Sequence, residues 1–169
     1  LAEARVVYVG ERHDQPADHD VQRRILVALA ARRPGLAVGF EMFQTPYQAA
    51  LDDFVAGRID EPELLERTEW SRRWGFDFAM YRPLVRLGPD RGLALVALNA
   101  PQETTRIIAR EGLDPLDEPT RSALPELDRT EPAHRARVEA ALREHPHMTD
   151  AMLERFYTAQ LVWDEPMAA

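Results

Sequence analysis

The sequence predicts an α/β fold: a mainly parallel sheet flanked by helices, with an additional helical portion. Three apolar runs predict buried parallel strands, because strands covered on both faces show little polar alternation; they span residues 5–11, 36–43 and 93–101. Helical patterns separate these runs, and such alternation favours right-handed crossovers. The chain has 169 residues, which suits a single α/β domain spanning 1–169.

Helix signals follow the first two predicted strands in order. Residues 17–33 carry apolar side chains at 3.6-residue spacing and predict a helix. After the second strand, we expect Thr45 to cap a helix whose capping box is closed by Gln48. Asp60 and Glu63 repeat the same device and predict a further helix.

The rest of the chain is predicted to be largely helical. Residues 71–87 indicate helical or irregular structure, and the proline- and acid-rich residues 112–132 indicate a loop or short helices. Two amphipathic helices follow at 133–145 and 150–163. We expect the second to bury one face, made of Met152, Phe156, Ala159 and Trp163.

The last residues continue a helical pattern, and three strands are few for so many helices. We therefore expect further strands beyond Ala169 and a domain that is incomplete at its C-terminal side, with residues 112–169 mostly helical.

Composition excludes several kinds of chemistry. The sequence has no cysteine, which excludes disulfides, thiolate nucleophiles and cysteine metal sites. All 21 basic residues are arginine, so Schiff-base lysine chemistry is also excluded. The net charge of −8 argues against nucleic-acid binding, which depends on a basic surface.

Polar side chains follow or end the predicted strands. Glu11 and His13 follow the first, Glu41 ends the second and Asn99 ends the third. Ligands of open α/β sheets bind beyond the carboxyl ends of strands, so these side chains are candidates for one site. Glu41 lies among apolar residues and needs a partner, either a site ligand or an arginine such as Arg82.

The histidines near the N-terminus separate into two groups. His13 could ligate a metal or act as a general base. His19 lies between Asp18 and Asp20, which could simply cap the following helix. A second histidine pair, His145 and His147, looks like part of a loop that connects helices.

An aromatic stripe forms the second candidate feature. Trp70, Trp74 and Tyr81 fall near one helical face and could form a wall for a planar ligand. Arg82 or the neighbouring Arg72 and Arg73 could then pair with carboxylates of that ligand. The alternative is an ordinary aromatic core.

Together these motifs resemble the ChaN family of bacterial haem-binding, iron-regulated lipoproteins, within the Tiki superfamily. The resemblance rests on YVGERHDQPADH, GFEMFQTPYQAALDDFVAG, TEWSRRWGFDFAMYRPL, VALNAP and RFYTAQLVWDEPMA. It implies a mixed α/β fold, a role in haem or iron acquisition, and haem held between the subunits of a homodimer. The superfamily's GxxH motif matches residues 10–13, and its glutamates match Glu11 and Glu41.

The resemblance also implies a location in the bacterial cell envelope, as an outer-membrane lipoprotein or in the periplasm, and an outer-membrane haem transport system as partner. The lipobox cysteine, the signal and a later GxxH-like stretch of the family are not in this sequence.

Two functional hypotheses follow. In the first, the chain binds haem without catalysis: the aromatic wall stacks on the porphyrin, and arginines such as Arg82 meet the propionates. A tyrosine or histidine ligates the iron, the candidates being Tyr81, Tyr157, His145 and His147.

In the second hypothesis the chain is a metal-dependent hydrolase, protease- or esterase-like. His13 and Glu41 hold a divalent metal, and Glu11 acts as general base on a metal-bound water.

Overall fold

The computed structural model describes residues 3–143 and 148–168 and confirms the α/β class. The chain divides into two compact units, one up to Ala97 and one from Leu98 onward. None of the described helices is long and apolar enough to cross a membrane.

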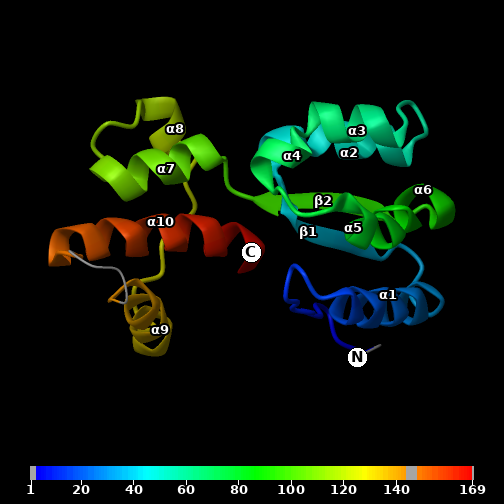
Figure 1. The fold of residues 1–169 in the computed structure, drawn as a ribbon, viewed down its shortest axis with the longest axis horizontal. Helices are drawn as coiled ribbons and strands as arrows, with labels where there is room; N and C mark the ends of the chain where they lie inside the picture. Colours follow the sequence, from blue (N-terminus) through cyan, green and yellow to red (C-terminus); the bar gives the residue numbers. More distant parts are fainter. Residues whose placement is uncertain (1–2, 144–147, 169) are drawn as a thin grey trace. The chain divides into compact units, whose positions relative to one another are not determined.

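A two-stranded parallel sheet organises the first unit. It pairs β1 (Ala37–Gln44) with β2 (Ala94–Asn99), whose last residues pass into the second unit. In Figure 1, α1 lies on one side of these strands, and α2, α3 and α4 lie on the other. The helices of this unit are α1 (Pro16–Ala30), the 3₁₀ helix η1 (Thr45–Tyr47), α2 (Gln48–Val55), α3 (Glu61–Arg67), α4 (Trp70–Arg73), α5 (Phe78–Val85) and α6 (Leu87–Arg91).

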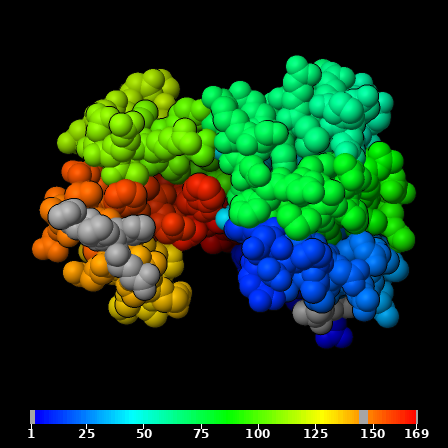
Figure 2. Space-filling model, viewed as in Figure 1, coloured from blue at the N-terminus to red at the C-terminus, as the bar shows by residue number. Residues whose placement is uncertain are grey.

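The predicted first strand, residues 5–11, is wrong: this segment forms no strand in the described part of the chain. Side chains of α1 and of the residues after it hold this part of the chain: Gln22 donates a hydrogen bond to the Val9 carbonyl, and Arg33 donates one to the carbonyl of Ala4, just before the segment. Val6 and Tyr8 are 65% and 71% exposed. A strand requires a neighbour that pairs with its backbone, and among the described residues only β1 and β2 form a sheet, so the segment has the composition of a strand without a described partner. Figure 2 shows the N-terminal segment and α1 (blue) at the surface of this unit.

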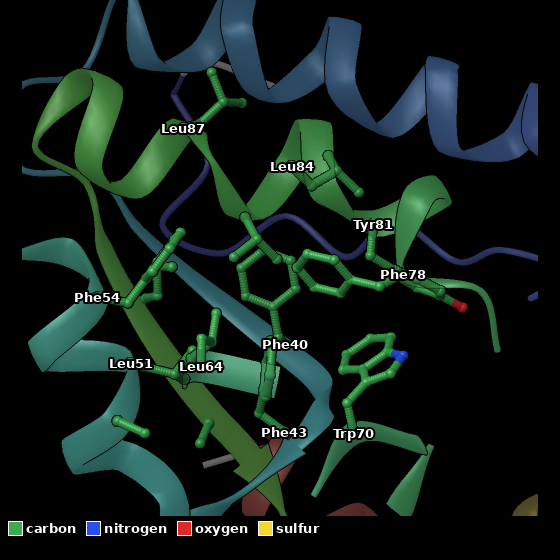
Figure 3. Close-up of a cluster of buried hydrophobic side chains, with 14 of the residues drawn as sticks. Phe40, Phe43, Leu51, Phe54, Leu64, Trp70, Phe78, Tyr81, Leu84 and Leu87 are labelled. Atoms are coloured by element: carbon green, nitrogen blue, oxygen red, sulfur yellow. The ribbon is translucent and has the colours of Figure 1, made fainter. Parts of the chain in front are cut away.

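The core of the first unit is aromatic. Figure 3 shows Phe40 and Phe43 of β1 surrounded by side chains from the helices between β1 and β2. Trp70 packs edge-on against Phe78 and also contacts Phe43 and Tyr81. Burying each such side chain contributes about 1.5–3 kcal/mol, so this cluster supplies much of the unit's stability.

The predicted capping of two helices has different outcomes. Asp60 caps α3 as predicted, since its carboxylate accepts from the Glu63 amide at 3.0 Å. The capping box at Thr45 and Gln48 is wrong: the Gln48 amide group instead donates to the Leu95 carbonyl and accepts from the Ala97 amide, both at 2.8 Å. The side chain thereby satisfies two backbone groups of β2 that pair with no strand among the described residues.

The second unit is helical, as predicted. It contains α7 (Gln102–Glu111), α8 (Glu118–Ser122), α9 (Pro132–Arg143) and α10 (Asp150–Ala168), and α10 packs on both α7 and α9. Helix α7 was not predicted from the sequence. The buried face of α10 was also wrong except at Ala159, because α10 contacts two helices and buries a wider face, made of Leu153, Tyr157, Thr158, Ala159, Leu161 and Val162.

The substitution Gln48→Ala should destabilise the first unit by about 1–3 kcal/mol, because two buried backbone groups of β2 lose their partner. Urea unfolding measures this free energy. Asp52→Ala is the matched control: Asp52 accepts from the same amide of Gln48 but is exposed, so it should change stability by less than about 0.5 kcal/mol. Equal losses in the two variants would contradict the role of the contacts with β2.

Candidate functional site

A tight turn before α1 presents the predicted site residues of the N-terminal segment. The Gln15 amide donates to the Arg12 carbonyl, which closes the turn. Asp18, which could have capped α1, instead accepts from the Arg12 amide and from Arg12 Nε, both at 3.0 Å. The helix N-cap is Gln15, without a side-chain bond. Asp18 therefore fixes the turn that carries His13.

The carboxylate of Glu11 is the centre of the site. Its side chain is 7% exposed, and its Oε1 accepts from the Tyr81 hydroxyl at 2.8 Å and from His13 Nδ1 at 3.0 Å. Its Oε2 lies 3.1 Å from His19 Nδ1, although the angles are too poor for a hydrogen bond. Three side chains from separate positions in the sequence thus converge on one buried carboxylate.

His19 belongs to this cluster, although the sequence analysis favoured a role for its segment at the helix start. The residue lies in the first turns of α1 and is buried. Its Nε2 lies 3.2 Å from the His13 carbonyl oxygen, and its ring packs edge-on against Tyr81. Its helical spacing to the buried Leu26 was the signal for an inward-facing side chain.

His13 is the accessible member of the cluster, with a side chain 38% exposed. A carboxylate can only accept hydrogen bonds, so in the neutral ring the proton lies on Nδ1 and the lone pair on Nε2. Trp74 and Phe76 flank the ring at 4.7 and 5.1 Å between centroids, and Phe76 is 37% exposed. The arrangement offers an imidazole nitrogen beside two aromatic rings.

Two members of the predicted aromatic wall lie inside the core. Trp70 is 4% exposed and its indole N–H donates to the Phe76 carbonyl, while Tyr81 is fully buried. Burial raises the pKa of the Tyr81 hydroxyl well above its ordinary value; Glu11 and Glu41 raise it further, against an opposing effect of Trp74. Tyr81 is therefore a neutral donor to Glu11.

The predicted strand-end residues occupy different places. Glu41 lies inside β1, which continues to Gln44, and it is close enough to Tyr81 to influence its ionisation. Asn99 ends β2 as predicted and is 2% exposed. Within the described residues, no group of three or more His, Asp or Glu side chains is arranged to hold a metal ion.

The arginines proposed to meet a ligand's carboxylates have acidic partners. Arg82 pairs with Glu61, not with Glu41, at 2.8 and 2.9 Å from its Nε to the two carboxylate oxygens. Arg72 and Arg73 both pair with Glu69. A ligand carboxylate at any of these arginines would have to share it with the protein or displace a protein carboxylate.

Tyr157 lies in the second unit and is fully buried, with the Arg135 guanidinium 4.9 Å from the centre of its ring. Its hydroxyl has no hydrogen-bond partner among the described residues. His147 and His145 lie outside the described residues.

Acid should weaken the first unit as Glu69 becomes protonated. Hydrogen bonds from Arg72, Tyr47 and Arg73 lower the pKa of Glu69 from 4.5 to about 2. A lowered pKa in the folded state gives stability that is present above 4.5 and is lost as the pH falls toward 2. Glu69→Gln should flatten the pH dependence of unfolding in this window.

Urea unfolding at a series of pH values tests this. Glu66→Gln, at an exposed position of the same segment, is the control and should keep the slope of the unmodified chain. An unchanged slope in Glu69→Gln would show that its ion pairs contribute nothing to the acid response.

Comparison with known proteins gives a consistent result. A family model described as "Haem-binding uptake, Tiki superfamily, ChaN" matches residues 1–169. A solved structure, "Cofacial heme binding to ChaN of Campylobacter jejuni", superposes with a TM-score of 0.70 at 19% identity. The match covers 94% of this chain and 62% of that chain, so this sequence spans less than two thirds of the relative. No curated protein matches the chain. On the match along its whole length, the chain belongs to the ChaN family of the Tiki superfamily.

Proposed function

We propose that this protein binds haem and that His13 is the residue that faces the iron. Membership of a haem-binding uptake family supports the ligand class. The observation that carries the proposal is the partly exposed side chain of His13, whose Nδ1 lies 3.0 Å from the Glu11 carboxylate. Imidazole nitrogen with this kind of support is a common ligand of protein-bound metals.

The surroundings of His13 fit a haem. The porphyrin is planar and apolar, and Trp74 and Phe76 offer aromatic surface beside the imidazole. Trp74 and Phe76 also contact each other, with centroids 5.8 Å apart. When bound, haem would supply an iron centre that accepts an axial nitrogen ligand.

The other predicted haem residues fit less well as they are placed. An axial ligand must reach the iron, whereas the hydroxyls of Tyr81 and Tyr157 belong to fully buried side chains. Tyr81 also donates to Glu11, so ligation would break that bond. Trp70 and Arg82 would act only as support, through the core and through the pair with Glu61.

The hydrolase alternative gains no observation in its favour. It requires His13, Glu41 and a further ligand around one metal ion, and the described residues do not form such a group. Haem binding is therefore the function we propose.

We further propose a homodimer in the cell envelope, with haem between the subunits, acting with an outer-membrane haem transport system. The relative from Campylobacter jejuni is described by cofacial haem binding. Light scattering with and without haemin would measure the mass of the assembly. A monomer in both states would exclude the dimer without excluding haem binding.

Haemin titration of the full-length protein should give a shifted Soret band at about one haem per chain. His13→Ala should weaken binding more than about tenfold and change the spectrum, because the axial nitrogen is lost. Added imidazole should restore the spectrum of His13→Gly, since the site is open to solvent.

His134→Ala is the matched control. His134 also pairs with a carboxylate, Asp164, but it lies in the second unit, so its loss should leave the spectrum unchanged. If Tyr157→Phe or His147→Ala loses the band while His13→Ala keeps it, the iron ligand is not His13. If the unmodified protein gives no shifted band, haem binding itself is excluded.

A further inference from the structure

We infer that residues 129–143, which comprise α9 and the three residues before it, form a cover over one face of α10, and that this cover opens at high ionic strength and exposes Tyr157. Opening of the cover requires no haem. It is a conformational change within the second unit, and it controls whether solvent or a ligand can reach the phenol of Tyr157.

Two faces of α10 are buried. Ala159 and Val162 belong to an apolar cluster shared with α7, which among the described residues includes none of α9. Leu153, Tyr157 and Leu161 follow one another at four-residue spacing, so they lie on a different face of the helix. Figure 1 shows α7 and α9 on opposite sides of α10, and both helices pack on it. The face that carries Tyr157 is therefore the one that α9 covers.

The cover supplies the charged and aromatic side chains around Tyr157. The guanidinium groups of Arg135 and Arg129 lie 4.9 and 5.9 Å from the centre of the Tyr157 ring, and the centroid of the His134 ring is 5.8 Å away. Tyr157 is fully buried, whereas no residue of α9 is itself buried. Helices dock mainly by burying apolar side chains, so polar contacts carry a larger share of the attachment of α9.

The polar contacts between the cover and α10 are exposed ion pairs. Arg135 and Arg129 donate to the two carboxylate oxygens of Glu154, and His134 Nε2 lies 3.0 Å from Asp164 Oδ2. The side chains of the two arginines and of Glu154 are 39–46% exposed. Ion pairs at such exposure contribute little each and are screened by salt, so high ionic strength should weaken the attachment of the cover.

The Tyr157 hydroxyl gains hydrogen bonds when the cover opens. It is buried without a hydrogen-bond partner among the described residues, which costs free energy in the closed form. Water would satisfy the hydroxyl in the open form and offset part of the apolar surface that opening exposes. Burial raises the pKa of the hydroxyl, an effect that Arg135 and Arg129 partly oppose. The open form should therefore ionise, and react as a phenolate, more readily.

Nitration by tetranitromethane at constant pH, measured at each tyrosine by mass spectrometry, tests the opening. Raising the salt from about 0.01 M to about 1 M shortens the Debye length from about 30 Å to about 3 Å. Nitration of Tyr157, relative to that of the 71% exposed Tyr8, should then rise roughly two- to tenfold. Tyr81, which is fully buried in the first unit, should stay unreactive.

The substitution Glu154→Gln removes the charge that Arg129 and Arg135 share. Nitration of Tyr157 should rise at low salt by a similar factor, and its further response to salt should shrink, because the screened interaction is already lost. A loss of packing alone would leave the salt response unchanged.

Arg135→Gln and Arg143→Gln form a matched pair. Both arginines pair with Glu139 inside α9, whereas among the described residues only Arg135 of the two also pairs with α10. Arg135→Gln should increase the nitration of Tyr157, and Arg143→Gln should leave it unchanged.

A salt-dependent rise at Tyr157, with Tyr81 unreactive and hydrogen exchange in α7 unchanged, would support the cover. An unreactive Tyr157 under all these conditions would overturn the inference, as would equal effects of Arg135→Gln and Arg143→Gln. Faster hydrogen exchange in α7 together with α9 would also overturn it, because the unit would then unfold rather than open. If circular dichroism shows that Glu154→Gln does not fold, the salt series of the unmodified protein and the arginine pair decide.

Discussion

The buried carboxylate of Glu11 joins three parts of the first unit that are distant in sequence. It accepts from Tyr81 of α5, lies against His19 of α1 and holds His13 of the preceding turn. The segment before it forms no strand in the part of the chain that the structure describes, so these side-chain contacts help to fix where the N-terminal turn lies. Because removal of one partner leaves a buried charge uncompensated, the cluster is the constraint on which the local arrangement depends.

The aromatic residues near this cluster divide between core and surface for a reason of backbone geometry. Trp70 and Tyr81 lie on short helices and belong to one buried cluster with Phe40 and Phe43 of β1. Gly75 has a φ of 82°, a left-handed conformation that glycine adopts without strain, and it ends α4 abruptly. Trp74 and Phe76 flank this turn and therefore reach His13 at the edge of the core.

Rules that use only neighbouring residues in the sequence predicted the helices and strands better than they predicted the contacts between distant side chains. The helix at 17–33, the cap at Asp60 and the two strands around Phe40 and Leu95 follow from periodicity and capping, which are properties of neighbouring residues. The pairing of Gln48 with β2 and the place of His19 depend on residues brought together by folding. The strand at 5–11 was wrong because composition indicates a strand without indicating its partner.

The contacts of the candidate site were likewise not predictable from neighbouring residues alone. The order of Glu11 and His13 behind an apolar run indicated a polar site, but spacing alone could not show that Tyr81 would donate to the carboxylate rather than face a ligand. Periodicity placed Trp70 and Tyr81 on one face and could not distinguish a core from a binding wall, because both require the same apolar stripe.

Not every buried polar atom around Glu11 has a hydrogen-bond partner among the described residues, and this distinguishes the cluster from one that only stabilises the fold. Glu11 Oε2 and His19 Nδ1 are both buried and 3.1 Å apart, yet they are not aligned as a hydrogen bond. Poorly paired polar groups in a core cost free energy, and an apolar core at this place would avoid that cost. Buried polar groups that are poorly paired are expected at positions where a function has to be maintained. Here the buried carboxylate of Glu11 contacts the partly exposed imidazole of His13, so the costly buried group lies next to a side chain that solvent can reach.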